Sequence, residues 1–370
     1  MNETYANRLH NLARAQKDSH VDVVAIVPGA NLRYLTGLQM HTSERITLAL
    51  FPVGGQSVFV LPALEAPRAE ANLGSEASFY TYTDEQGPGP AFQKMASALD
   101  LKSKVLGVEY LQMRVLELRQ LEAHAPDARF VDAQPLLSGL RIIKDKEEIE
   151  ALRRAAGVNE GCFRQVMEHI KPGVTEQQLA SVWQRAVLEA ENSQLSDIPT
   201  IVASGPNGAS PHTTATSRRL QKGDMVTIDA FLLVDGYFSD ITRTYAVGEP
   251  EEELKRIYSV VQEANAAARD FIKPGVRAEE VDAAARRVIE QAGYGEYFIH
   301  RTGHGMGLEI HEEPNIVEGN DLLLKQGMVF TVEPGIYLPG KGGVRIEDNI
   351  LVTEIGCETL TNLSRDLVRL

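Results

Sequence analysis

A ten-residue motif occurs twice in this chain, and its repetition restricts the fold more than any other feature of the sequence. IKPGVTEQQL at residues 170–179 is followed by IKPGVRAEEV at residues 272–281. In each copy the Pro-Gly pair is expected to end one helix and to allow the next to begin. Self-similarity at a fixed distance indicates duplicated structural units. We therefore predict two related halves, at about 145–250 and 251–360, each with helices followed by strands, around a central site.

The part of the chain before residue 141 has a different pattern. The first segment, MNETYANRLHNLARAQ, predicts an amphipathic helix. Short apolar runs predict strands at 21–27, 47–53, 57–62 and 105–109. The segment 109–124 has apolar residues at helical spacing and predicts a helix. This alternation predicts a small α/β domain over residues 1–140. A long helix predicted over 141–170 then opens a second domain, 141–370.

The formal net charge of −14 argues against several classes of partner. Nucleic acid and anionic membranes repel an acidic protein, so we expect neither as a partner. Cys162 and Cys357 are too few for a disulfide framework and form no CxxC pair. The N-terminus lacks the pattern of a signal peptide, and no apolar run approaches the roughly 18–20 residues of a membrane span. The expected location is therefore the cytoplasm.

Two aspartates lie within a predicted β-hairpin. Asp235-Gly236 between two apolar runs is a strong turn signal, and a two-residue loop there places Phe231 opposite Asp240. Asp229 then shares a face with Asp240, at a diagonal Cα separation of roughly 7–8 Å. Carboxylates placed in this way can converge on one cation. By itself, the pair is equally compatible with a solvent-facing edge hairpin.

Two glutamates occupy a second β-rich region. Glu333 ends one apolar run, and Glu347 lies within the next, VRIEDNILV. A hairpin centred near Gly340 places the two side chains opposite each other, unless the glycine-rich loop contains a bulge. The sequence separation between the two acidic pairs is nearly the same as that between the two copies of the repeated motif. Each half is therefore expected to bring two carboxylates toward one axis. Four buried acids require cations, and two divalent ions are the simplest solution.

Histidines accompany both carboxylate pairs. His304 lies between glycines in HRTGHGMGLEIHEEP, where the absence of side chains permits close approach of another group. His311 follows in the same segment, and His212 in SGPNGASPHTTAT is its counterpart in the first half. Four carboxylates and His304 form an oxygen-rich set. Such a set favours Mn²⁺, with Zn²⁺, Co²⁺ and Fe²⁺ as alternatives, and argues against a thiolate-type structural site.

Together these motifs resemble those of the pita-bread metallopeptidases, a fold shared by prolidases, Xaa-Pro aminopeptidases, methionine aminopeptidases and creatinase. The resemblance covers nearly the whole chain, because PGANLRYLTGL at 28–38 is also similar to the N-terminal domain of prolidases and Xaa-Pro aminopeptidases. It implies an α/β (α+β) fold class, with a small N-terminal α/β domain before a pita-bread domain that has a pseudo-two-fold internal repeat. It also implies a homodimer and a dinuclear-metal exopeptidase that hydrolyses the Xaa-Pro bond of dipeptides or short peptides.

The resemblance also assigns roles to individual residues. The family's metal ligands match Asp229, Asp240, His304, Glu333 and Glu347, and its catalytic positions match His212, His311, Glu333 and Arg345. Two positions depart from the family pattern. Phe231 stands where glycine is frequent, and Thr213 stands where glycine or histidine is often seen. These departures bear on fine specificity rather than on the metals.

The expected mechanism is metal-assisted hydrolysis, in which two cations acidify a shared water. Glu333 takes the proton of this water, His311 helps to stabilise the oxyanion, and His212 holds the substrate or shuttles a proton. Thr242 is expected either to hydrogen-bond a ligand carboxylate or only to pack within its strand.

Three alternatives stay open. The first is the choice between a dipeptidase and an aminopeptidase that acts on longer chains. A dipeptidase needs a group that binds the substrate carboxylate, and the candidates are Arg33, His41, Arg45 and Arg301. Creatinase-like amidino hydrolysis without metal and a non-catalytic peptide-binding role are the other two. The intact set of metal ligands argues against both.

Overall fold

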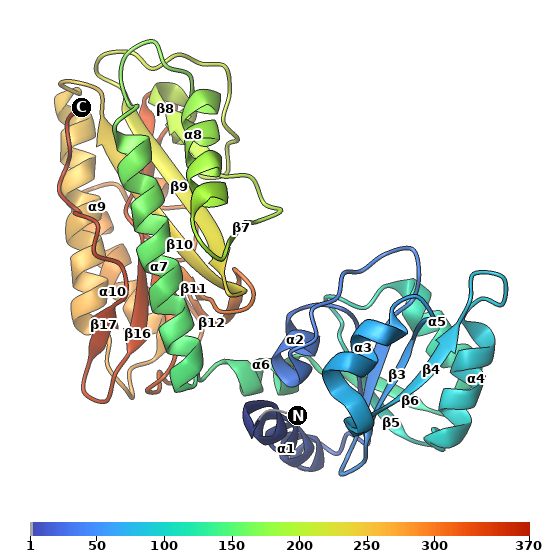
Figure 1. Cartoon of the computed structure of the whole chain (residues 1–370). Coiled ribbons are helices and arrows are strands. Elements are labelled where there is room, and N and C mark those ends of the chain that lie inside the picture. The colour runs from blue at the N-terminus through green and yellow to red at the C-terminus, as the bar shows by residue number, and fades with distance from the viewer. Residues whose placement is uncertain (1–2) are drawn as a thin grey trace. The chain divides into compact units, whose positions relative to one another are not determined.

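The computed structural model describes residues 3–370, which divide into two compact units, one ending at Arg141 and one running from Ile142 to Leu370. Figure 1 shows the helices and strands of both. Among the described residues, no helix is both long enough and apolar enough to cross a membrane.

The first unit is built on one mixed sheet. Its strand order is β4-β3-β2-β1-β5-β6, in which β1 pairs antiparallel with β2 and parallel with β5. The strands are β1 (Val23–Ile26), β2 (Leu48–Pro52), β3 (Ser57–Pro62), β4 (Ala77–Tyr82), β5 (Val105–Val108) and β6 (Arg129–Asp132). The helices are α1 (Glu3–Asp18), α2 (Ala30–Thr36), α3 (Ala66–Leu73), α4 (Gly89–Ala98), α5 (Val115–His124) and α6 (Gln134–Arg141), with a 3₁₀ turn, η1 (Gly74–Glu76).

The sequence predicts much of this unit but places the start of one helix too early. The N-terminal helix is present as α1, and the predicted strands are present as β1, β2, β3 and β5. The helix expected over 109–124 begins only at Val115. Glu109 does not join it, because its buried carboxylate accepts hydrogen bonds from the backbone of Val27 at 2.7 Å and from Asn31 at 2.8 Å. Strands β4 and β6 were not predicted.

The second unit carries the repeat. Its helices are α7 (Lys146–Met167), α8 (Glu176–Glu189), α9 (Glu252–Phe271) and α10 (Ala278–Gln291), with 3₁₀ turns η2 (Gly205–Ala209) and η3 (Gly295–Tyr297). Its strands are β7 (Ser193–Leu195), β8 (Ile201–Ser204), β9 (Met225–Val234), β10 (Tyr237–Ala246), β11 (Gly303–Gly305), β12 (Glu312–Ile316), β13 (Val329–Val332), β14 (Gly335–Leu338), β15 (Gly342–Arg345), β16 (Asp348–Val352) and β17 (Cys357–Thr359). These strands form three sheets. In the first, β9 pairs with β10, β7 and β8. The second has the strand order β12-β11-β13-β16-β17, and the third consists of β14 and β15.

The two copies of the repeated motif have the same structure, as predicted. The first copy joins α7 to α8, and the second joins α9 to α10. Gly173 and Gly275 have φ angles of 89° and 88°, a region that glycine enters at little cost. Their amides donate to equivalent carbonyls, of Leu220 at 2.8 Å and of Leu324 at 2.9 Å. Each helix pair therefore docks in the same way on the strands of its own half.

The two hairpins also have the predicted registers. Asp235 and Gly236 form the turn between β9 and β10 with φ angles of 51° and 81°, and Asp240 pairs with Phe231. In the second hairpin Val332 pairs with Asp348 and Gly335 pairs with Arg345, which is the register centred on Gly340 without a bulge.

The helices that cover the hairpins are held by one buried asparagine in each half. Asn159 of α7 donates to the carbonyl of Ala230 in β9 at 2.8 Å. Asn265 of α9 donates to the carbonyl of Val332 in β13 at 3.1 Å. Figure 1 shows α7 and α8 in green and α9 and α10 in orange, each pair with its own strands. One apolar core per half surrounds these contacts.

Candidate metal centre

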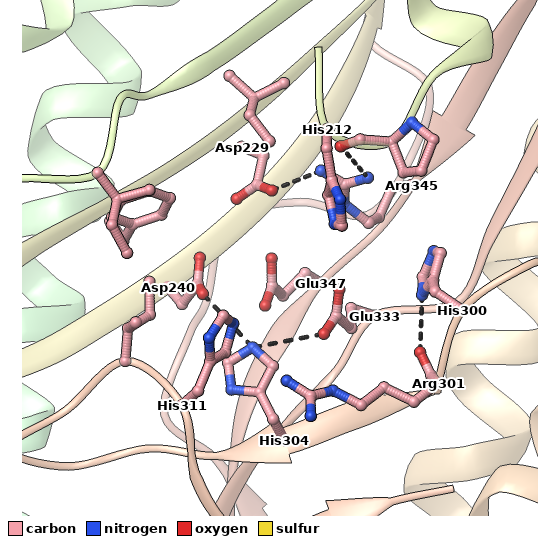
Figure 2. A pocket seen from close by; sticks show the side chains of 15 residues that line it. His212, Asp229, Asp240, His300, Arg301, His304, His311, Glu333, Arg345 and Glu347 are labelled. Carbon is pink, nitrogen blue, oxygen red and sulfur yellow. Dashed lines mark hydrogen bonds and ion pairs between the residues drawn. The ribbon is translucent and has the colours of Figure 1, made fainter. Parts of the chain in front are cut away.

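The residues singled out in the sequence line one cavity of about 420 Å³ in the second unit. Figure 2 shows four acidic side chains converging on its centre, with histidines and arginines around them. The predicted site residues that line it are His212, Asp229, Asp240, His304, His311, Glu333, Arg345 and Glu347. Phe231 also lines the cavity, whereas Thr213 is not among the lining residues.

The four acids come from the two hairpins. Asp229 lies on β9 and Asp240 on β10. Glu333 and Glu347 lie at the junction where the second hairpin passes from β13 and β16 into β14 and β15. At this junction their amides turn away from each other: Glu333 N donates to Thr302 O at 2.8 Å, and Glu347 N donates to Thr242 O at 3.1 Å. The second hairpin is thus joined to β10 of the first half.

The imidazole of His304 faces these acids. Its Nε2 lies 3.4 Å from Glu333 Oε1 and 3.7 Å from Asp240 Oδ2. One potential ligand atom each of Asp240, His304 and Glu347 lies within 4.8 Å of the other two. All three residues are buried. This spacing allows a single cation to contact all three side chains.

Three carboxylate oxygens in the centre have no hydrogen-bond partner within residues 3–370. They are Asp229 Oδ1, Asp240 Oδ1 and Glu347 Oε1, and all are buried. A buried polar atom without a partner is costly, and a buried charge is more costly still unless it is paired or coordinates a metal. Oxygen-rich sites suit hard divalent cations. The residues present therefore fit the divalent metals that the sequence predicts.

Burial and mutual repulsion make these acids reluctant to ionise in the absence of a cation. Burial raises the pKa of Asp240 well above its usual value, and the charges of Glu347 and Asp229 raise it further. The pKa of Glu347 is raised well above its usual value by burial and by Glu333 and Asp229. Burial raises the pKa of Glu333 to about 7, although Arg345 opposes the shift. A bound divalent cation inverts this situation because it favours the ionised form.

The imidazole of His304 is held in its neutral form. Burial lowers its pKa to about 3, and the nearby His311 adds to this effect. Its Nδ1 lies 3.1 Å from the carbonyl of Gly305, so Nδ1 carries the proton and Nε2 directs a lone pair at the carboxylates. The flanking glycines are required: a Cβ on Gly303 would lie 1.8 Å from Thr331 O, and one on Gly305 would lie 2.2 Å from Glu313 O. The close approach predicted from the sequence is confirmed.

A second set of hydrogen bonds supports the acids. Arg345 Nη2 donates to Asp229 Oδ2 at 2.5 Å, and Arg345 Nη1 donates to the hydroxyl of Tyr337 at 2.7 Å. That hydroxyl lies 2.8 Å from Nε2 of His300. Thr242 Oγ1 donates to Glu347 Oε2 at 2.6 Å, so the first of its two predicted roles is observed. Tyr337 and His300 carried no signal in the sequence, because neither belongs to an interpretable spacing.

The remaining histidines lie toward the open side of the cavity. The His311 ring stands edge-on to that of His304, with centroids 4.3 Å apart. Burial lowers the pKa of His311, and the positive charge of Arg301 contributes. His212 is exposed and lies on the loop that precedes β9. Arg301, one of the candidates for binding a carboxylate, also lines the cavity, and Figure 2 shows its guanidinium group beside His304.

Comparison with known proteins gives consistent matches over both units. Residues 150–354 match the model of metallopeptidase family M24, and residues 8–143 match that of the creatinase/prolidase N-terminal domain. The chain is 40% identical to "Probable dipeptidase PepE" of Mycobacterium tuberculosis, over 99% of this chain and 96% of that protein. It is 35% identical to "Xaa-Pro dipeptidase" of Pyrococcus furiosus, over 98% of this chain and 99% of that protein. The crystal structure of a recombinant prolidase from Thermococcus sibiricus superposes with a TM-score of 0.95 at 37% identity and covers 100% of both chains.

Proposed function

The chain belongs to metallopeptidase family M24, and we propose that it is an exopeptidase that hydrolyses the Xaa-Pro bond of dipeptides or short peptides. The observation that carries the proposal is the group of buried, unpartnered carboxylate oxygens facing Nε2 of a neutral histidine. Relatives at 35–40% identity over nearly the whole chain are named dipeptidase or Xaa-Pro dipeptidase, which supports the substrate class.

The metal ligands in this proposal are the four acids and one imidazole of the centre, namely Asp229, Asp240, His304, Glu333 and Glu347. Family membership implies a divalent metal. The oxygen-rich ligand set favours two Mn²⁺ ions, with Zn²⁺, Co²⁺ and Fe²⁺ as alternatives. Such ions supply Lewis acidity, which allows water to lose a proton near neutral pH and polarises the substrate carbonyl.

The chain's own groups then have distinct tasks. Glu333 accepts the proton of the attacking water, since its carboxylate lies at the centre of the site, 3.4 Å from Nε2 of His304. Neutral His311 retains one N–H, which donates to the oxyanion that develops on the carbonyl oxygen. Arg345 holds the carboxylate of Asp229 in place. His212 contacts the substrate from the open side of the cavity.

The distribution of charge suggests how a dipeptide lies in the site. Its ammonium end is directed toward the acids, and its carboxylate toward Arg301, which lines the cavity from β11's side of the centre. Replacing Arg301 by Met should therefore raise KM for a Xaa-Pro dipeptide more than for a Xaa-Pro peptide with an amidated, longer C-terminus. Equal effects on the two substrates would show that Arg301 does not bind the carboxylate.

Hydrolysis of matched substrates tests the function directly. Metal-stripped protein is assayed with a Xaa-Pro dipeptide and a Xaa-Pro-Xaa tripeptide, with and without Mn²⁺. We expect Mn²⁺-dependent cleavage of the dipeptide; cleavage of the tripeptide would identify an aminopeptidase instead. Metal-independent hydrolysis of creatine would support the creatinase-like alternative, and metal binding without any hydrolysis would support a binding role.

Two expectations from the sequence remain predictions. A homodimer would appear as twice the chain mass of 40.7 kDa in sedimentation equilibrium. Cytoplasmic location would appear as recovery of the protein in the cytoplasmic fraction of its source cells.

A further inference from the structure

One buried carboxylate accepts hydrogen bonds from both ends of the loop that carries His212. Glu176 is the first residue of α8 and is fully buried. Its Oε1 accepts hydrogen bonds from the amide and the hydroxyl of Ser204, both at 2.7 Å. Its Oε2 accepts from the amide of Thr216 at 3.0 Å and from the Thr216 hydroxyl at 2.6 Å. Asn207 Nδ2 lies 3.1 Å from both oxygens. Each oxygen therefore holds one end of the segment 205–215.

The middle of this loop is held by a close backbone contact. Gly208 packs against Gly343 of β15 so tightly that a Cβ on Gly343 would lie 2.1 Å from the carbonyl oxygen of Gly208. Arg345 Nη1 lies 3.4 Å from the carbonyl oxygen of Pro211, the residue before His212. The loop thus meets the second hairpin directly beside the acids.

The ring of His212 has no comparable support of its own. It is exposed, and within residues 3–370 no hydrogen bond to its ring is found. Its position over the cavity is consequently set by its backbone. Hydrogen bonds to an ionised carboxylate are among the strongest that a protein makes, so Glu176 is the main restraint on that backbone.

We propose that Glu176 is a positioning residue that acts on the reaction through His212. The proposal rests on the function given above, in which His212 contacts the substrate. Displacing a catalytic group by about 1 Å can cost about 10²-fold in rate, so loosening of the loop should be measurable.

The second half contains a related arrangement. Asp282 of α10 is buried, and its Oδ1 accepts from the amide of Thr302 at 3.1 Å and from the Thr302 hydroxyl at 2.7 Å. Thr302 lies two residues before His304. In both halves, an acid near the start of the second helix therefore holds the segment that carries a site histidine.

A double-mutant cycle tests the proposal. The variants are Glu176→Gln, His212→Ala and the combination, with kcat/KM measured on a Xaa-Pro dipeptide in saturating Mn²⁺. We expect Glu176→Gln alone to lower kcat/KM by about 10- to 100-fold. In the His212→Ala background it should have less than about a twofold effect, because the two residues act as one unit. Hydrogen exchange should also accelerate at residues 205–216 in Glu176→Gln.

Glu160 provides a matched control. It is a buried carboxylate on α7 that also accepts backbone hydrogen bonds, including that of Leu363 at 3.1 Å, but it does not contact the His212 loop. Glu160→Gln should leave kcat/KM within about twofold and exchange at 205–216 unchanged. If Glu176→Gln does not fold, Thr216→Val removes a single hydroxyl donor and takes its place in the same cycle.

The possible outcomes distinguish the positioning role of Glu176 from the proposed peptidase function. Losses that multiply in the double mutant, or full activity of the Glu176 variant, would overturn the positioning role and leave the peptidase function intact. Full activity of His212→Ala would overturn the role assigned to His212, and the inference with it. An inactive wild-type enzyme in saturating metal would instead contradict the proposed function.

Discussion

Thr242 donates a hydrogen bond from Oγ1 to Glu347 Oε2 at 2.6 Å, and this bond joins the hairpin of one half to that of the other. Arg345 Nε donates to the same hydroxyl oxygen at 3.2 Å. The single proton of Thr242 is thereby committed to Glu347. Glu347 Oε1 has no hydrogen-bond partner among the described residues, so both of its lone pairs are available to a metal.

Replacing Thr242 by Val should weaken metal binding. Valine keeps the shape and the β preference of threonine but cannot orient Glu347, and loss of a hydrogen bond to a ligand typically lowers metal affinity by about 10- to 100-fold. Isothermal titration of the metal-free protein with Mn²⁺ measures the change. Thr227→Val is the control, because its hydroxyl pairs with Thr244 at 3.1 Å and contacts none of the four acids. Equal affinities for the two variants would contradict the assigned role.

The metal-free protein should lose stability as the pH rises above about 7. In this range the site histidines, whose pKa values are lowered, are neutral in the folded chain and largely neutral in the unfolded chain, where the usual pKa is about 6.5. Asp240, Glu333 and Glu347 have raised pKa values, so they retain protons in the folded state that the unfolded chain has already released. Each retained proton lowers the free energy of unfolding by about 1.4 kcal/mol per pH unit until the folded pKa is passed.

Thermal melts at pH 7, 7.5 and 8 measure this dependence. The midpoint of the metal-free protein should fall across the series, whereas that of the protein in saturating Mn²⁺ should not, since the cation stabilises the ionised carboxylates. A metal-free midpoint that rises with pH would show that the acids are already ionised in the folded state.

Replacing Asp240 by Asn should abolish activity and yet stabilise the metal-free fold at pH 8. The substitution removes a proposed metal ligand. It also replaces a buried carboxyl, which at this pH must either keep a proton or ionise beside Glu347 and Asp229, with a neutral amide. The midpoint of the metal-free variant should rise by a few degrees, because about 1 kcal/mol moves a domain of this size by about 2–4 °C. Asp235→Asn, at the exposed turn of the same hairpin, should change neither property. A lower midpoint for Asp240→Asn would show that the buried carboxyl does not destabilise the metal-free fold.

Replacing Phe231 by Ala should broaden the choice of N-terminal residue. Phe231 pairs directly with Asp240 and lines the cavity, so its ring occupies space beside the acids. The ratio of kcat/KM for Leu-Pro to that for Gly-Pro should rise by about tenfold, the scale on which pockets discriminate by size. Phe238→Ala is the control, because Phe238 belongs to the same apolar cluster but is not a cavity-lining residue. An unchanged ratio would exclude Phe231 as a determinant of size.

The acids of the centre could be found from the sequence because tight turns determine both hairpin registers. Asp235-Gly236 and Gly340 adopt positive φ angles, and each of these turns determines which residues face each other for several positions on either side. The start of the helix predicted over 109–124 was wrong for the opposite reason, since the helix begins at Val115. Its apolar spacing is local, but Glu109 is drawn out by contacts with residues about eighty positions away.

The supporting residues could not be predicted in this way. Glu176 acts on Ser204 and Thr216, and Tyr337 contacts His300, across loops whose paths no local pattern specifies. Asn159 and Asn265 likewise look like ordinary helical residues in the sequence, because their hydrogen bonds to strand carbonyls form only in the folded structure. Spacing in the sequence therefore predicted the acidic residues of the cavity. It did not predict the residues whose hydrogen bonds hold the site in place.

Two identical halves around a common axis would present the same groups to both ends of a bound molecule. A peptide has an ammonium at one end and a carboxylate or amide at the other, so it could enter such a site in two opposing directions, one of them unproductive. Here the first half contributes the exposed His212, and the second contributes buried His304 and half-buried Arg301. Because both halves belong to one chain, each can carry different groups, and a single direction of substrate binding would arise from those differences rather than from the shared scaffold.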